Sequence, residues 1–134
     1  MKRIVLAIAV ATLGLGNLAF ADEAKVAAGE KVFKKCKACH AVGESAKNKV
    51  GPQLNDLFGR VPGSIEGYKY SKAMVAYGED GKVWDEEILA AYLAGPKKLV
   101  KGTKMSFSGL KKPDDIANIL EYLETFDPDE ESSS

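Results

Sequence analysis

The stretch Cys36-Lys37-Ala38-Cys39-His40 decides how this chain folds. It contains both cysteines and the only histidine of the 134 residues. Scattered at random, two cysteines and one histidine would fall into such a pentapeptide on the order of once in ten thousand chains of this length. This concentration indicates a site that needs all three side chains together.

Cys-x-x-Cys-His is the attachment pattern of c-type haem. Each thiol adds to one vinyl group of the porphyrin, and the histidine that follows is placed beneath the iron as an axial ligand. The sequence therefore predicts one covalent haem c, with Cys36 and Cys39 as the attachment residues and His40 as the first metal ligand.

Three other chemistries use paired cysteines. A thioredoxin-like redox pair follows a strand in a βαβ unit, whereas Cys36 follows a lysine-rich helical stretch. A structural zinc ion needs four Cys or His ligands, and the chain has three such residues, all in the pentapeptide. A disulfide is compatible with export, but it would close a very short loop and leave His40 without a role.

The second face of the iron needs another donor, and two methionines lie beyond the N-terminal segment. Met105 follows Gly102-Thr103-Lys104 in an irregular stretch, where a loop can bring a thioether to a metal. Met74 lies in a short helical stretch and is expected to fill space. His and Met together are the ligands of electron-transfer haems. We therefore expect His40 and Met105 as metal ligands, and an electron carrier rather than an enzyme.

Helical patterns separated by Gly-rich and Pro-rich connections, with no alternating strand pattern, predict an all-α fold. Long irregular stretches at 60–83 and 97–112 need something to organise them, and a large buried haem would do so. The expected helices cover residues 23–35, 53–58 and 85–94, a segment beginning at Pro113, and a short stretch around Met74.

Residues 1–21 have the pattern of a secretory signal peptide. Lys2 and Arg3 precede a largely apolar stretch, and Ala19-Phe20-Ala21 supplies small residues where a signal peptidase cuts. Cleavage after Ala21 would release the protein into the periplasm. A retained membrane anchor is the alternative, which the short apolar stretch disfavours.

The mature chain divides into a domain at 22–126 and a tail at 127–134. The tail contains acids, Pro128 and three serines but no apolar residue, so we expect it to be disordered. The formal net charge of the whole chain is zero, which gives no indication of nucleic-acid binding.

The chain resembles the class I cytochromes c, and among them the bacterial cytochromes c2 and c550, which are similar to mitochondrial cytochrome c. The resemblance covers nearly all of residues 24–126. Its motifs occur in the family's order: Gly29…Phe33, Cys36-x-x-Cys39-His40, Gly51-Pro52, Gly67-Tyr68-x-Tyr70-Ser71, Trp84, Tyr92-Leu93…Pro96-Lys97-Lys98, Gly102-Thr103-Lys104-Met105-x-Phe107 and Tyr122-Leu123. The loop from Lys72 to Lys82 departs from the mitochondrial pattern, so no haem contact is carried over there.

The resemblance implies a fold of helices and long loops wrapped around one covalently attached haem, and it implies roles for single residues. The Pro52 carbonyl would accept a hydrogen bond from the non-ligating nitrogen of His40. Gly29 and Phe33 would pack against Ile119 and Tyr122 where the first and last helices cross.

Other implied roles concern the two haem propionates and the Met105 sulfur. Arg60, Tyr70 and Trp84 would surround one buried propionate, whose burial requires hydrogen-bond donors. Thr103 would serve the other propionate, and Tyr92 would lie near the Met105 sulfur.

Lysines concentrate on both sides of the predicted ligands. They are Lys31, Lys34, Lys35 and Lys37 before the motif, and Lys97, Lys98, Lys101, Lys104, Lys111 and Lys112 around Met105. Such an edge, including Lys35, Lys97, Lys98 and Lys104, would steer docking onto acidic patches of membrane redox complexes.

The resemblance thus implies a soluble, monomeric periplasmic shuttle without a stable membrane anchor. It would carry single electrons from a cytochrome bc1-type donor to a terminal oxidase or a photosynthetic reaction centre. The alternative is a haem enzyme or sensor with a labile sixth iron site, and Met105 is the residue that separates the two.

Overall fold

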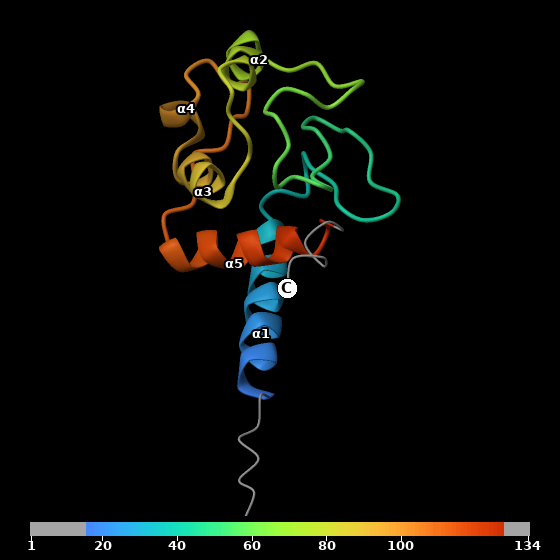
Figure 1. The fold of residues 1–134 in the computed structure, drawn as a ribbon, viewed down its shortest axis with the longest axis vertical. Helices are drawn as coiled ribbons and strands as arrows, with labels where there is room; N and C mark the ends of the chain where they lie inside the picture. Colours follow the sequence, from blue (N-terminus) through green and yellow to red (C-terminus); the bar gives the residue numbers. More distant parts are fainter. Residues whose placement is uncertain (1–15, 128–134) are drawn as a thin grey trace, which may run out of the picture.

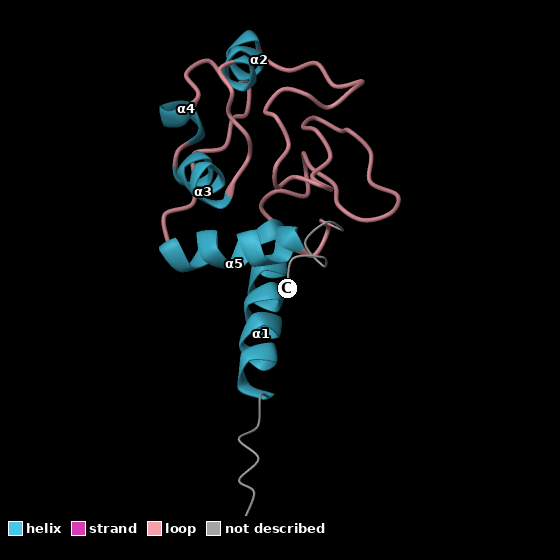
Figure 2. Ribbon diagram, viewed as in Figure 1, coloured by secondary structure: helices cyan, strands magenta, loops and turns pink. Residues whose placement is uncertain are grey.

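The computed structural model describes residues 16–127, and this part of the chain contains helices and loops but no strand. Figure 1 shows α2, α3 and α4 on one side of the molecule and the loops of residues 40–70 on the other, and Figure 2 separates helices from loops. The predicted all-α class is confirmed. The helices are α1 (Gly16–Phe33), α2 (Lys72–Glu79), α3 (Glu86–Ala94), α4 (Pro96–Leu99) and α5 (Pro113–Glu124).

Helices α1 and α5 cross and make the most extensive contact between helices in the described chain (Figure 1). Gly29 permits the close approach, because a Cβ atom there would overlap the carbonyl oxygen of Asn118 and lie 2.7 Å from Cβ of Tyr122. The Phe33 ring lies 5.4 Å from the Tyr122 ring, and Phe33 shares the core cluster with Ile119. The packing predicted for this crossing is confirmed.

Polar residues determine where α2 and α3 begin. The Ser71 side chain accepts a hydrogen bond of 3.1 Å from the Met74 N–H, and the Asp85 side chain accepts one of 2.8 Å from the Ile88 N–H. Such caps satisfy donors that a helix start leaves without an internal partner. Helix α5 begins with Pro113, which has no N–H to satisfy. The helices predicted at these three places are confirmed.

The helix predicted over residues 53–58 is wrong, because this stretch forms turns. Asp56 adopts a left-handed conformation with φ of 53°. The carbonyls of Gln53 and Asn55 accept hydrogen bonds from the Arg60 guanidinium instead of from helical N–H groups. These contacts outweigh the weak helix preference of so short a segment.

Two further boundaries differ from the prediction. Helix α1 begins at Gly16 and ends at Phe33, and its first turns project beyond the crossing with α5 (Figure 1). Helix α4 occupies part of a predicted loop. Pro96 ends α3 as expected, but proline also suits the first position of a new helix.

The predicted terminal segments fall largely outside the described residues. These are residues 1–15 of the predicted signal peptide and residues 128–134 of the predicted tail. Asp127 was expected in the tail, yet it is only 9% exposed and so belongs with the folded domain. Within residues 16–127, no helix combines the length and apolarity that a bilayer crossing requires.

Candidate functional site

Tight turns follow α1 and present the two cysteines. The Cys36 N–H donates to the Phe33 carbonyl at 2.8 Å, and the His40 N–H donates to the Cys36 carbonyl at 2.8 Å. Cys36 and Cys39 are half-buried free thiols. Burial raises the pKa of Cys36, and the positive charge of Lys35 offsets only part of this rise. As long as no group is attached to Cys36, its thiol therefore keeps its proton at neutral pH.

The His40 ring is oriented by the loop that follows the motif. Its Nδ1 lies 2.7 Å from the Pro52 carbonyl oxygen, which can only accept, so Nδ1 carries the proton. Gly51 packs so closely that a Cβ atom there would lie 2.5 Å from Cε1 of the ring. Burial lowers the pKa of His40 despite the bond to Pro52. The ring is therefore neutral at neutral pH, and Nε2 has a lone pair for a metal.

Met105 lies in the segment between α4 and α5, where it is half-buried and packs against the core. Its N–H donates to Oγ1 of Thr103 at 3.4 Å. The same Oγ1 shares a hydrogen bond of 2.9 Å with the hydroxyl of Tyr92 in α3. Burial raises the pKa of Tyr92, so its phenol is neutral. Tyr92 thus ties α3 to the segment that carries Met105.

Arg60 and Tyr70 are close enough for their side chains to interact electrostatically. The Arg60 guanidinium donates to the carbonyls of Gln53 and Asn55. Burial lowers its pKa, and the neighbouring Tyr70 acts in the opposite direction. The Tyr70 hydroxyl accepts a hydrogen bond from the Ile65 N–H at 3.2 Å, so its own proton remains available for an acceptor.

Trp84 is joined to this pair through the backbone. Its N–H donates to the Arg60 carbonyl at 2.8 Å, and its carbonyl accepts from the Gly59 N–H at 2.8 Å. The buried indole lies 5.0 Å from the Tyr92 ring and 6.3 Å from the Tyr77 ring. Trp84 therefore connects the predicted Arg60–Tyr70 group to the Tyr92–Thr103 group.

Two side chains without a predicted role shape the loops around the site. Asn55 exchanges hydrogen bonds of 2.9 and 2.8 Å with the backbone of Gly43. The Tyr68 hydroxyl donates to the Val50 carbonyl at 2.6 Å. Each is a polar residue inside a loop, which is a weak signal, and its partner is too distant in the sequence for a local pattern to identify.

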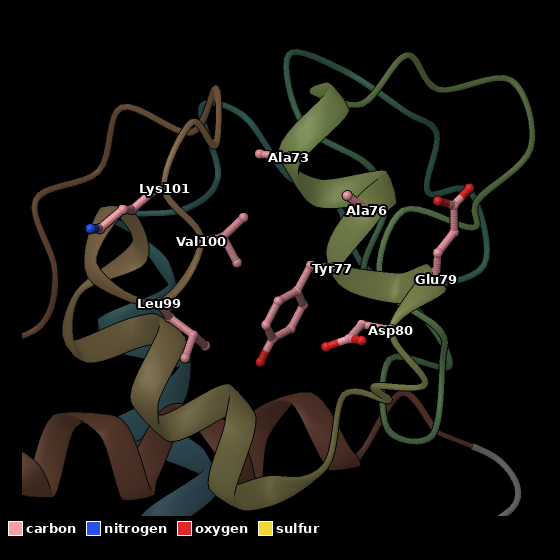
Figure 3. A pocket seen from close by; sticks show the side chains of 8 residues that line it. All are labelled: Ala73, Ala76, Tyr77, Glu79, Asp80, Leu99, Val100 and Lys101. Atoms are coloured by element: carbon pink, nitrogen blue, oxygen red, sulfur yellow. The ribbon is translucent and has the colours of Figure 1, made fainter.

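A groove of about 520 Å³ lies between α2 and the segment at 99–101 (Figure 3). Figure 3 shows the Tyr77 ring pointing into this groove, with the Asp80 carboxylate toward it. None of the predicted site residues lines the groove. It is therefore separate from the site built around Cys36 and His40.

The family model described as cytochrome c matches residues 26–127, which is most of the chain. The chain belongs to the cytochrome c family. It is 57% identical over 104 residues to cytochrome c2 of Afifella marina, a match that covers 78% of this chain and 84% of that protein. It is 52% identical over 103 residues to cytochrome c-550 of Ancylobacter novellus, a match that covers 77% of this chain and 96% of that protein. The solved structure of cytochrome c2 from Rhodospirillum centenum has a TM-score of 0.74 at 38% identity. This match covers 77% of this chain and 98% of that one.

The resemblance to class I cytochromes c, with c2 and c550 among them, is thus confirmed. The cytochrome carries one covalently attached haem c, since its two cysteines have the family's attachment spacing. The residues also fit this group: Cys36 and Cys39 are not joined in a disulfide, so each can bond to haem, and the bond from His40 Nδ1 to Pro52 leaves the Nε2 lone pair for the iron. The cytochrome is accordingly an electron carrier of the c2 and c550 kind.

Proposed function

We propose that the cytochrome shuttles single electrons in the periplasm, with His40 and Met105 as the two axial ligands of its iron. The observation that carries the proposal is the 2.7 Å bond from His40 to the Pro52 carbonyl, which leaves the lone pair of Nε2 for the iron. Haem supplies the one-electron chemistry when bound. With both axial positions filled by side chains, no position remains for a substrate or for oxygen.

Met105 suits the second ligand position better than Met74. Met74 is only 7% exposed and lies within α2 in the core cluster. It behaves as the packing residue expected from the sequence. Met105 lies in a segment without a regular helix, and Tyr92 and Thr103 hold that segment in place.

The remaining site residues would satisfy the carboxylates of the haem. Arg60, Tyr70 and Trp84 would supply donors for one propionate, and the Thr103 hydroxyl would serve the other. A buried carboxylate without such donors is strongly unfavourable. The neutral Tyr92 phenol would influence the Met105 sulfur through Thr103.

Export and partners complete the proposal. Residues 1–21 would be removed by a signal peptidase after Ala21, which leaves a monomer without a membrane anchor. The cytochrome would take electrons from a bc1-type complex and deliver them to a terminal oxidase or a photosynthetic reaction centre. Docking would use the lysine-rich edge that includes Lys35, Lys97, Lys98 and Lys104, all of which are exposed.

Replacement of Met105 tests the proposed ligation. In Met105→Ala the sulfur-to-iron absorption band should disappear, and the reduced protein should bind carbon monoxide readily. Met74→Leu is the matched control, because it removes the other thioether at nearly constant volume, and its spectrum should match that of the wild type. A wild type that binds carbon monoxide readily would instead support a haem enzyme or sensor with a labile sixth site.

A further inference from the structure

Residues 66–69 form a segment that contacts the His40 side of the site. Nδ2 of Asn48 donates to the Glu66 carbonyl at 3.4 Å, and the Tyr68 hydroxyl donates to the Val50 carbonyl at 2.6 Å. Val50 directly precedes Gly51, whose backbone packs against the His40 ring. The segment is therefore fixed to the loop that orients the imidazole.

The same segment also contacts the residue next to Met105. Nζ of Lys104 lies 4.4 Å from the centroid of the Tyr68 ring, and it donates a hydrogen bond to the Lys69 carbonyl. An ammonium group over a tyrosine ring is attracted by the negative face of the ring. A charged donor also strengthens the bond to the carbonyl. Tyr68 thus contacts the His40 side through its hydroxyl and the Met105 side through its ring.

We propose that Lys104 is a positioning residue, a latch that holds the Met105 segment against Tyr68 and Lys69. The inference rests on the proposed ligation by Met105 and gives Lys104 a role beyond docking. Release of the latch frees the residue that directly precedes the ligand. The Met105 segment then leaves the iron more often, and external ligands gain access to it.

The latch requires both charge and reach. Lys104→Gln removes the charge that the Tyr68 ring attracts and shortens the side chain by one atom. Lys104→Arg keeps the charge and can still contact both the ring and the carbonyl. Lys101→Gln makes the same charge change at an exposed position three residues away, so it controls for a general electrostatic effect.

Imidazole binding to the oxidised holo-cytochrome measures how often the Met105 segment opens. Lys104→Gln should bind imidazole about tenfold faster than the wild type, from the loss of a cation–π contact and a charged hydrogen bond. Lys104→Arg should stay near the wild-type rate, and Lys101→Gln should leave it unchanged. Tyr68→Leu should accelerate binding, and the double variant with Lys104→Gln should be only slightly faster than the faster single variant.

Three results separate the possible failures. Suppose that the wild type shows the sulfur-to-iron band and that Lys104→Gln binds imidazole at the wild-type rate. This result would overturn the latch and leave the proposed function intact. Equal acceleration by Lys101→Gln would overturn it as well, since the effect would then follow charge and not contact. Absence of the band from the wild type would overturn the ligation by Met105, and the latch with it.

Discussion

Two neighbours and burial constrain the single imidazole of the chain. The Pro52 carbonyl fixes the proton on Nδ1 of His40, the Gly51 backbone packs against the ring, and burial keeps the ring neutral. Pro52 and Gly51 both lie within twelve positions of the histidine. The ring is therefore oriented by a short stretch of the chain, and little conformational freedom remains to be lost on metal binding.

Tyr92 is the residue whose ionisation should couple stability to alkaline pH. Its native pKa is raised by burial, so the folded state holds this proton more tightly than the unfolded state does. The contribution of this phenol to the free energy of unfolding is fully present below its unfolded pKa of about 10. It is lost as the pH rises through the native pKa. Tyr92→Phe should lower the free energy of unfolding at pH 7 by about 1 kcal/mol, through loss of the bond to Thr103.

The difference in free energy of unfolding between Tyr92→Phe and the wild type, here called the gap, should close as the pH rises above about 10. Denaturant unfolding of both proteins across this range measures the gap. Thr103→Val is the control, because it removes the same hydrogen bond but keeps the phenol, so its gap should not close. A constant gap for Tyr92→Phe would show that this phenol does not titrate differently in the two states.

Among the elements, the crossing of α1 and α5 depends most on a single residue. Gly29 has no side chain at the point where the Asn118 carbonyl and Tyr122 approach. Helix interiors ordinarily gain stability when glycine is replaced by alanine, because alanine has the higher helix propensity. Packing at the crossing should reverse that sign.

Gly29→Ala should lower the free energy of unfolding by about 2 kcal/mol, since overpacking outweighs the gain in helix propensity. Guanidinium unfolding of the holo-cytochrome measures the change. Ala27→Gly, at an exposed position of the same helix, should follow propensity alone and lose about 1 kcal/mol. An increase in stability for Gly29→Ala would mean that the helices separate at little cost.

The sequence predicted those elements that its local chemistry specifies. Asp85 and Pro113 mark helix starts by their own side chains, and both helices begin there. The helix predicted at 53–58 is wrong because Arg60 binds carbonyls of this stretch. No sequence periodicity reveals such a contact. At the site, the Cys36–His40 motif predicted the haem, whereas the contact between Tyr68 and Lys104 depends on the folded chain.

At the scale of the molecule, the described chain has no helix between Phe33 and Lys72. Side chains hold this long stretch: Asn55 bonds to Gly43, Tyr68 to Val50 and Asn48 to Glu66. Loops of this length are uncommon in compact domains unless they carry function. The covalent haem accounts for them, because it supplies apolar surface on which the loops can pack.

Charge is the other property of the whole molecule that bears on function. The lysines of residues 31–37 and 97–112 are all exposed, and no acid interrupts the second stretch. Exposed charges of one sign attract an acidic partner over about one screening length, ~10 Å at 0.1 M salt. Attraction of this kind raises the rate of encounter more than the strength of the complex.

Reversal of charge on α4 should therefore slow electron transfer at low salt. Lys97→Glu and Lys98→Glu should each reduce the second-order rate with an acidic redox complex about fivefold or more at low ionic strength, and the reduction should fade as salt screens the charges. Lys25→Glu makes the same change at an exposed position in α1, away from the lysine-rich edge, and should have a smaller effect. Stopped-flow kinetics across a salt series measures both. Equal slowing by all three variants would indicate that net charge governs the encounter. Slowing confined to Lys97→Glu and Lys98→Glu requires that the partner approach the lysine-rich edge.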